Sequence, residues 1–218
     1  MKKRILLIAV ALFLSGCARY QEVPEPPAAK ETTEGIEQVE TEAQTQPEEE
    51  TDTRVPKQVK GIYLSAYIAG TPKLMDNILA EIDKSQVNAV VIDVKNDDGR
   101  ITFPMDTPVV NEIGACKPYI SDVDELIKKL KERDIYVIAR VVAFRDPYLA
   151  EAKPEWSLKK ADGSLYRDNK GLAWVNPYKK EVWDYLIEVG KAAAEAGFDE
   201  VQFDYIRFST EKGMKQVV

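Results

Sequence analysis

The 218-residue sequence contains no histidine and only two cysteines, Cys17 and Cys116. The missing histidine excludes imidazole-based catalytic triads, haem ligation by histidine and histidine-rich metal sites. Two cysteines give no disulfide framework, and we expect Cys116 to be a small half-buried side chain. The segment 65–71 lacks the glycine spacing of a dinucleotide-binding turn, so a flavodoxin-like fold has no cofactor signal. The sequence therefore predicts no metal and no organic cofactor.

The amino terminus has the three parts of a bacterial export signal. Positive charges at residues 2–4 precede an apolar run over residues 5–14, which is too short to cross about 30 Å of hydrocarbon. Ser15 and Gly16 before Cys17 resemble a lipobox, which implies cleavage before Cys17 and lipidation of its thiol. We expect residues 1–16 to be a signal peptide and the mature protein to be an exported lipoprotein, held by Cys17 at the extracytoplasmic face of a membrane. The alternative is an ordinary secretory signal.

Residues 17–56 have the composition of a linker. Between residues 20 and 56 there are eleven acidic side chains, two basic ones and five prolines. Such a segment cannot bury enough apolar surface to offset chain entropy, so we expect a disordered tether. Of the net charge of −7, this stretch contributes −9 and the residues before it +4, which leaves −2 for residues 57–218. A nearly neutral folded part gives no reason to expect nucleic acid as a partner.

From Gly61 onward, short β-branched runs alternate with amphipathic helical stretches, a pattern typical of βαβ units and a parallel sheet. Strands are predicted at residues 61–67, 88–95, 135–142 and 198–208. Helices are predicted to begin near Thr71 and Ser121 and to cover residues 178–196, and the long loop 145–177 is of a size that is usually functional. Four such units predict an α/β fold, the N-terminal half of a (β/α)8 TIM-type barrel.

No further strand or helix pattern follows Phe208. An open half-barrel would leave unpaired parallel strands at both edges of its sheet. We therefore expect residues 57–218 to be a truncated domain, the product of a split gene, or a chain that a partner polypeptide completes with the second half-barrel.

Alternation along the predicted strands separates a helix-facing set of side chains from an inward-facing set. The polar or aromatic inward residues are Tyr63, Ser65, Tyr67, Asp93, Lys95, Tyr136, Arg140, Gln202 and Asp204. Most of them gather toward the carboxyl ends of the strands, where (β/α)8 enzymes build their active sites. The alternative is a purely structural network in which Arg140 and Lys95 neutralise the two aspartates. Because buried ion pairs seldom stabilise a core relative to apolar packing, the pattern favours a functional site.

Four stretches together resemble one bacterial family. They are VIDVKNDDG at 91–99, ARVVAFRDP at 139–147, WVNPY at 174–178 and GFDEVQFDYIRF at 197–208. In this order they are similar to the family described as "putative glycosyl hydrolase domain", a group of barrel proteins that resembles α-amylase-type and chitinase-type glycosidases. The resemblance implies a barrel over residues 57 to about 210 and a carbohydrate substrate.

The same resemblance implies roles for single residues. Asp204 falls on the aspartate that supplies the nucleophile in amylase-type enzymes, while Gln202 stands where their pattern has arginine. Gln202 and Ile206 replace two acids of the chitinase pattern, so a chitinase mechanism is disfavoured. In amylase-type barrels the general acid comes from strand five, which follows the four strands predicted here. Asp93 is a poor substitute, because Lys95 or Arg140 would hold it ionised.

The predicted site therefore has Asp204 as the catalytic residue. The predicted substrate contacts are Asp93, Lys95, Arg140, Gln202, Arg207, Tyr67 and Trp174, with aromatic rings stacking on sugar faces. The sequence predicts a surface-anchored glycoside hydrolase-like lipoprotein that acts on a polysaccharide and lacks its acid residue. The alternative is a non-catalytic glycan-binding or envelope-scaffold lipoprotein.

Overall fold

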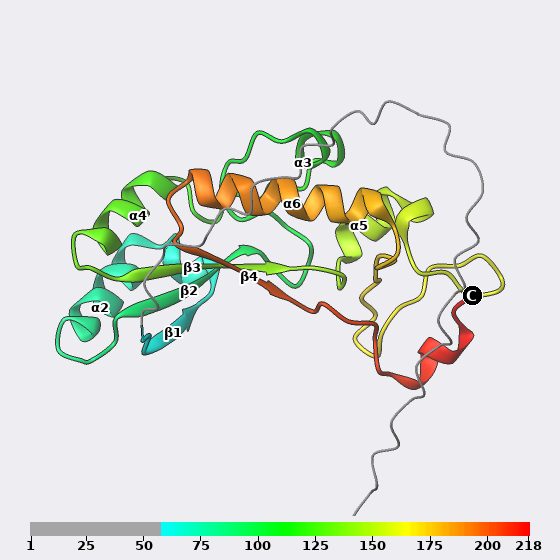
Figure 1. Cartoon of the computed structure of the whole chain (residues 1–218), viewed down its shortest axis with the longest axis horizontal. Coiled ribbons are helices and arrows are strands. Elements are labelled where there is room, and N and C mark those ends of the chain that lie inside the picture. The colour runs from blue at the N-terminus through cyan, green and yellow to red at the C-terminus, as the bar shows by residue number, and fades with distance from the viewer. Residues whose placement is uncertain (1–57) are drawn as a thin grey trace, which may run out of the picture. The chain divides into compact units, whose positions relative to one another are not determined.

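Four parallel strands form one sheet in the computed structural model, which describes residues 58–218 (Figure 1). The strands are β1 (Gly61–Leu64), β2 (Ala89–Lys95), β3 (Tyr136–Val142) and β4 (Glu200–Asp204). Each strand pairs in parallel with the next one along the chain, in the order β1-β2-β3-β4. Successive units of a (β/α)8 barrel follow this order, so the predicted α/β partial barrel is confirmed.

Helices connect the strands and cover one face of the sheet. They are α1 (Ala66–Ala69), α2 (Pro72–Ile82), α3 (Pro108–Ile113), α4 (Val123–Lys131), α5 (Pro147–Ala152) and α6 (Lys180–Glu195), with 3-10 turns η1 (Pro154–Trp156) and η2 (Lys212–Gln216). Helix α6 contacts β3 and β4, and Figure 1 shows it running alongside both strands. Helix α4 contacts β3, and α1 contacts β2.

Local capping chemistry determines where these helices begin. Asp122 accepts a hydrogen bond from the Glu125 amide at 2.9 Å, so α4 begins one residue later than a cap at Ser121 would place it. Asp146 caps α5 in the same way through the Leu149 amide at 2.8 Å. Helix α2 begins at a proline, whose missing amide hydrogen is not needed in a first turn.

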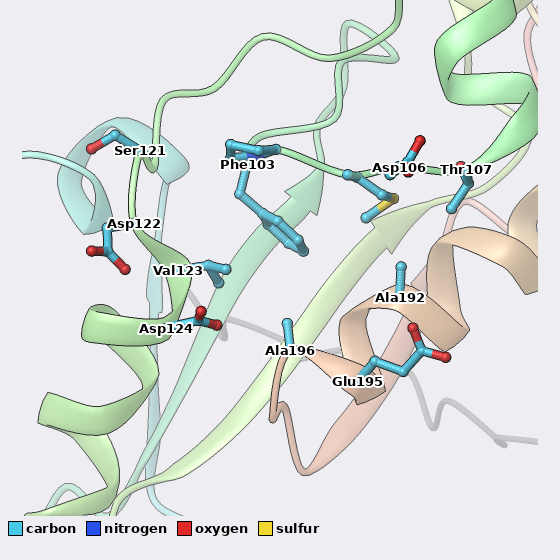
Figure 2. Close-up of a pocket in the computed structure, with 12 residues that line it drawn as sticks. Phe103, Asp106, Thr107, Ser121, Asp122, Val123, Asp124, Ala192, Glu195 and Ala196 are labelled. Carbon is cyan, nitrogen blue, oxygen red and sulfur yellow. The ribbon is translucent and has the colours of Figure 1, made fainter.

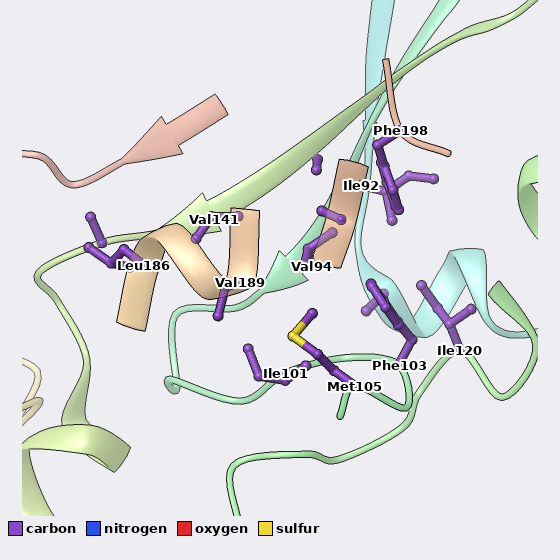
Figure 3. Packing of buried hydrophobic residues seen from close by; sticks show 14 of the residues in the cluster. Ile92, Val94, Ile101, Phe103, Met105, Ile120, Val141, Leu186, Val189 and Phe198 are labelled. Carbon is purple, nitrogen blue, oxygen red and sulfur yellow. The ribbon is translucent and has the colours of Figure 1, made fainter. Parts of the chain in front are cut away.

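The core lies between the sheet and the helices. The fully buried residues of β2 and β3 that face the helices are Val90, Ile92, Val94, Val137, Ala139 and Val141. Figure 3 shows Val141 near Leu186 and Val189 of α6, and the rings of Phe103 and Phe198 stack with centroids 6.3 Å apart. The helix-facing residues predicted for these two strands are therefore confirmed. Each buried valine or isoleucine contributes roughly 1.5–3 kcal/mol to stability.

Two strands are shorter than predicted. Strand β1 ends at Leu64 because Ser65 becomes the N-cap of α1 and accepts a hydrogen bond from the Ile68 amide at 3.4 Å. The prediction that Tyr67 lies on the strand and points inward is wrong: Tyr67 lies on α1 and is 63% exposed. Strand β4 ends at Asp204 because Tyr205 adopts a φ of 55°, in the left-handed region.

A β-bulge on β2 reverses the direction predicted for Lys95. In the register with β3, Asp93 pairs with Arg140 and Lys95 pairs with Val141, so one residue of β2 is extra. Because Val141 faces the helices, Lys95 faces them too, and it does not join Asp93 on the inner face. Its Nζ lies 2.7 Å from Asp146 Oδ2 and donates to the carbonyl of Val142 at 2.6 Å.

The long segment after β3 is folded back on itself. Antiparallel bridges join Ser157 to Val175 and Lys159 to Leu165, so a turn connects two extended pieces of this segment. At the tip of this turn, the Lys160 amide donates to the carbonyl of Ser164 at 2.9 Å. The fold of this segment places Asp168 and Trp174 beside the carboxyl ends of β3 and β4.

The predicted signal peptide, residues 1–16, and the predicted linker, residues 17–56, lie outside the described residues, so the lipidation of Cys17 stays a prediction. Within residues 58–218, no helix is both long and apolar enough to cross a membrane. Cys116 is half-buried, as expected, and its Sγ lies 3.3 Å from the carbonyl oxygen of Phe103.

Candidate functional site

Arg140 lies at the centre of a cluster of carboxylates at the carboxyl ends of β2, β3 and β4. Its Nη1 donates to Asp93 Oδ1 at 2.8 Å, and its Nε and Nη2 lie 2.9 and 2.7 Å from Asp204 Oδ2. Its Nη2 also lies 3.3 Å from Oδ1 of Asp97, in the turn after β2. The structure thus brings three of the predicted site residues, Asp93, Arg140 and Asp204, into direct contact.

The charge of Arg140 is fixed by these neighbours. Burial alone would lower the pKa of Arg140, but hydrogen bonds to Asp93 and Asp204 and the charges of Asp93 and Asp97 raise it above its ordinary value. The side chain of Asp93 is 7% exposed, whereas that of Asp204 is 44% exposed. Of these two carboxylates, Asp204 is therefore the one that a ligand in solution can reach.

Tyr63 of β1 extends the cluster toward the first strand. Its hydroxyl donates to Asp93 Oδ2 at 2.6 Å, and its ring centroid lies 5.9 Å from the guanidinium carbon of Arg140. Burial and the hydrogen bond to Asp93 raise the pKa of Tyr63 to about 12, so the hydroxyl keeps its proton at neutral pH. Strand alternation predicted the inward direction of Tyr63, but it gave no sign of this contact.

The backbone at the end of β4 orients the carboxylate of Asp204. The amide of Tyr205 donates to Asp204 Oδ1 at 2.7 Å, while Arg140 binds Oδ2. Tyr205 itself has a φ of 55°, a conformation that costs a non-glycine residue on the order of 1–3 kcal/mol. Both oxygens of Asp204 thus have a hydrogen-bond donor, which fixes the orientation of the carboxylate.

A second polar cluster, which was not predicted from the sequence, adjoins the first. Nε of Arg145 donates to Asp168 Oδ2 at 3.0 Å, and Nη1 donates to the hydroxyl of Tyr205 at 3.1 Å. The indole of Trp174 also donates to Asp168 Oδ2, at 3.2 Å. Asp97 Oδ1 lies 3.7 Å from Arg145 Nη1 and so connects the two clusters. Asp97 and Arg145 stand within the stretches that carry the family resemblance, which was the available signal.

Asp168 is ionised within this second cluster. Burial would raise the pKa of Asp168, but hydrogen bonds from the Leu172 amide, the Trp174 indole and the Lys170 amide, with the charge of Arg145, lower it below the ordinary value. For Arg145, burial lowers the pKa, and electrostatic interaction with Tyr205 and with the charge of Asp168 raises it above the ordinary value. The two side chains therefore form a buried ion pair.

The other predicted substrate contacts are not among the side-chain partners of Arg140. Lys95 faces the helices, and Tyr67 is exposed on α1. Gln202 is exposed on β4, next to Arg140 in the strand register. Trp174 is 2% exposed, so its ring cannot stack on a sugar in this arrangement, and the guanidinium carbon of Arg207 lies 5.6 Å from its centroid. Their roles in substrate binding stay predictions.

Of two pockets in the described residues, one lies away from these polar clusters and the other lies at the second cluster. One of about 440 Å³ lies between the start of α4, the end of α6 and the loop at Phe103 and Asp106 (Figure 2). It is lined by none of the residues that contact Arg140. A smaller pocket of about 130 Å³ is lined by residues of the second cluster. Within residues 58–218, no group of three or more cysteine or carboxylate side chains is arranged to hold a metal ion.

Comparison with solved structures supports the fold. A hypothetical protein from Ruminiclostridium thermocellum is 40% identical over 72% of this chain and 80% of that chain, with a TM-score of 0.68. The α-L-fucosidase isoenzyme 2 from Paenibacillus thiaminolyticus has a TM-score of 0.54 at 16% identity, over 71% of this chain and 24% of that chain. This second likeness shows the fold alone, and the chain spans about a quarter of the fucosidase's length. No curated protein matches the sequence.

The family resemblance can now be settled. The sequence profile of the family described as "putative glycosyl hydrolase domain" matches residues 61–218. This match covers every strand and helix of the described structure. The chain therefore belongs to this family.

Proposed function

We propose that this protein is a glycoside hydrolase in which Asp204 attacks the anomeric carbon of a polysaccharide substrate. The observation that carries the proposal is the geometry of Asp204 at the end of β4. Its carboxylate is part-exposed, is bound by the permanent charge of Arg140 and is fixed by the Tyr205 amide. Preorganised charge of this kind is what a carboxylate nucleophile requires in a barrel glycosidase.

The general acid would come from outside residues 58–218. Within these residues, the carboxylates that share Arg140 with Asp204 are Asp93 and Asp97, and both lie within hydrogen-bonding distance of its guanidinium. A group that is paired with a guanidinium is a poor proton donor. We place the acid on a further segment or a partner polypeptide, about 5 Å from Asp204 for a retaining mechanism.

The open edge of the sheet at β4 supports the proposal that a further segment or a partner packs there and carries the acid. Among the described residues, β4 pairs only with β3, and Phe203 on β4 is 37% exposed. Trp183 and Ile187 of the neighbouring α6 are 48% and 50% exposed. Apolar side chains beside an open strand edge form a surface that another strand and helix would cover.

We also propose that the protein acts at the cell envelope as a lipoprotein anchored through Cys17. The support is the order of charged, apolar and small residues before Cys17, followed by an acidic stretch suited to a tether. Such an anchor would hold the domain near polysaccharides of the envelope or the medium.

The nucleophile can be tested without the acid. Dinitrophenolate leaves an activated glycoside without protonation, so the full-length chain is incubated with a panel of 2,4-dinitrophenyl glycosides. Attack by Asp204 forms a carbon–oxygen bond to the anomeric carbon, and the electron pair of the broken bond leaves with the phenolate. We expect release by the wild type and a loss of at least about 1,000-fold in Asp204→Asn. Asp124→Asn, an exposed carboxylate on α4, is the matched control.

Each outcome decides the proposal. Release that persists in Asp204→Asn would remove Asp204 from the mechanism. No release from any glycoside by the wild type would contradict hydrolysis and favour a non-catalytic glycan-binding protein. Intact-mass measurement with 2-fluoro glycosides adds a direct readout, because a trapped glycosyl group on Asp204 raises the mass of the wild type only.

A further inference from the structure

The pocket of about 130 Å³ beside Tyr205 has an unusual concentration of cationic side chains. Arg145, Lys170 and Arg207 all line it, together with the carboxylates of Asp168 and Glu211. These five groups leave one net positive charge in a domain whose net charge is −2 over residues 57–218. The pocket is therefore a local cationic site on an acidic protein.

We propose that this pocket is a subsite for an anionic substituent of a glycan, such as the carboxylate of a uronic acid, a sulfate or a phosphate. The inference rests on the proposed function in that it names the class of glycan that reaches Asp204. Guanidinium and ammonium groups bind such oxyanions through charge-assisted hydrogen bonds.

The pocket has a rigid, buried base. Arg145 is 5% exposed, and its Nε and Nη1 are held by Asp168 and Tyr205. Asp168 also accepts the indole hydrogen of Trp174, which is 2% exposed. Because these groups fix one another, the base does not need to reorganise when an anion binds, which favours affinity.

Hydrogen-bond donors remain available at this base. Within residues 58–218, Nη2 of Arg145 has no hydrogen-bond partner, and neither does the ammonium group of Lys170. Arg207 uses Nη1 to bond the carbonyl of Phe208 at 3.2 Å, and its guanidinium lies over the rings of Trp174 and Tyr205. Its other donors are unused within the same residues. Glu211 is already engaged, because it accepts the amide hydrogen of Asn169.

The size and position of the pocket limit the kind of group that it can bind. A volume of about 130 Å³ corresponds to roughly four water molecules and is well below the 300–1,000 Å³ of pockets that enclose whole small ligands. The pocket therefore fits a charged substituent rather than a complete sugar ring. Tyr205 follows Asp204 directly, and Asp97 connects Arg145 to Arg140, so the substituent would lie on a sugar near the proposed nucleophile.

The test is binding of the full chain to matched polymers by affinity electrophoresis at physiological salt. Polygalacturonate is compared with its methyl ester, dextran sulfate with dextran, and phosphorylated dextran with dextran. We expect at least one charged polymer to bind about tenfold more tightly than its neutral counterpart. The pair that shows the preference identifies carboxylate, sulfate or phosphate as the substituent.

Variants of the pocket residues test whether this pocket causes the preference for charged polymers. The double variant Lys170→Gln/Arg207→Gln should bind charged and neutral polymers alike, while Lys128→Gln, an exposed lysine on α4, should keep the wild-type preference. Circular dichroism establishes that each variant is folded, and the single variant Lys170→Gln, at an exposed position, provides a milder test. Equal binding of charged and neutral polymers by the wild type, or a preference that survives in the double variant, would overturn the subsite.

These results are independent of turnover. If no dinitrophenol is released but the charged polymers are preferred, the subsite stands and the hydrolase proposal fails. If Asp204 reacts but charged and neutral polymers bind alike, the hydrolase proposal stands and the subsite fails.

Discussion

The arginine–aspartate pairs Arg140–Asp93 and Arg133–Asp83 differ in how deeply they are buried. The side chain of Arg140 is 13% exposed and that of Asp93 only 7%, whereas Arg133 and Asp83 are 35% and 50% exposed. A buried carboxylate that loses its partner keeps its desolvation cost, while an exposed one is rehydrated. The role of Arg140 is therefore both to position Asp204 and to allow Asp93 to be buried.

This difference gives a prediction for stability. Arg140→Met should lower the free energy of unfolding by about 3 kcal/mol, because Asp93 is left buried without its counter-charge. Arg133→Met, the matched control, should lower it by less than about 1 kcal/mol. Urea denaturation of both variants measures the two values. Similar losses in the two variants would show that the Arg140 cluster contributes no more than a surface ion pair.

At the scale of the elements, the turn after β2 is tied closely to the start of α5. Gly99 has a φ of 77°, and a Cβ added there would lie 2.0 Å from Asp146 Oδ1. Asp146 both caps α5 and pairs with Lys95. A side chain at Gly99 would therefore disturb the helix start and the buried ion pair together.

Comparing Gly99→Ala with Gly163→Ala separates the cost of crowding against Asp146 from the cost of backbone strain. Gly163 has a similar φ of 82°, but a Cβ there would meet nothing within 4 Å. Gly163→Ala should cost about 1 kcal/mol from the left-handed backbone alone. Gly99→Ala should cost at least about 2 kcal/mol more, because it also disturbs a cap and a buried pair. Thermal or urea unfolding gives both values, and equal losses would exclude the contact with Asp146 as a source of stability.

The elements also show what could be predicted from the sequence. Regular alternation along the strands was sufficient to bring Asp93, Arg140 and Asp204 onto one face, and the family resemblance added the role of nucleophile for Asp204. Lys95 was misplaced because a bulge breaks the two-residue period without a signal in the sequence. Asp168 was missed because it lies in an irregular segment, where no periodicity relates a residue to its neighbours in space.

At the scale of the whole molecule, helices cover only part of the sheet in the described domain. One face of the sheet is packed by helices, while the β4 edge and the outer side of α6 expose Phe203, Trp183 and Ile187. The charge is uneven as well, because the segment before the domain carries −9. In the proposed lipoprotein, repulsion between residues 20–56 and anionic lipid would keep the domain away from the membrane surface to which Cys17 anchors it.

The anchor itself can be tested through the two cysteines. When the full-length gene is expressed in a bacterial host supplied with an alkyne fatty acid, the protein should be labelled and found in the membrane fraction. Cys17→Ser should abolish the label and release the protein from that fraction, because the acylated thiol is lost. Cys116→Ser should change neither, since this half-buried thiol lies in the folded domain. Labelling that persists in Cys17→Ser would contradict the lipoprotein assignment.

The extra residue in β2 lets one short strand serve two separate electrostatic systems. Before the bulge, Asp93 supplies negative charge to the open side of the sheet, and after it, Lys95 supplies positive charge to the sealed side. A regular pleat over the same sequence, without the bulge, would turn Lys95, two residues after Asp93, toward Arg140. Two cations would then compete for the same aspartates, and Asp146 would be stranded in the interior without a counterion. The spacing of these two charges is thus as much a part of the site as their identity.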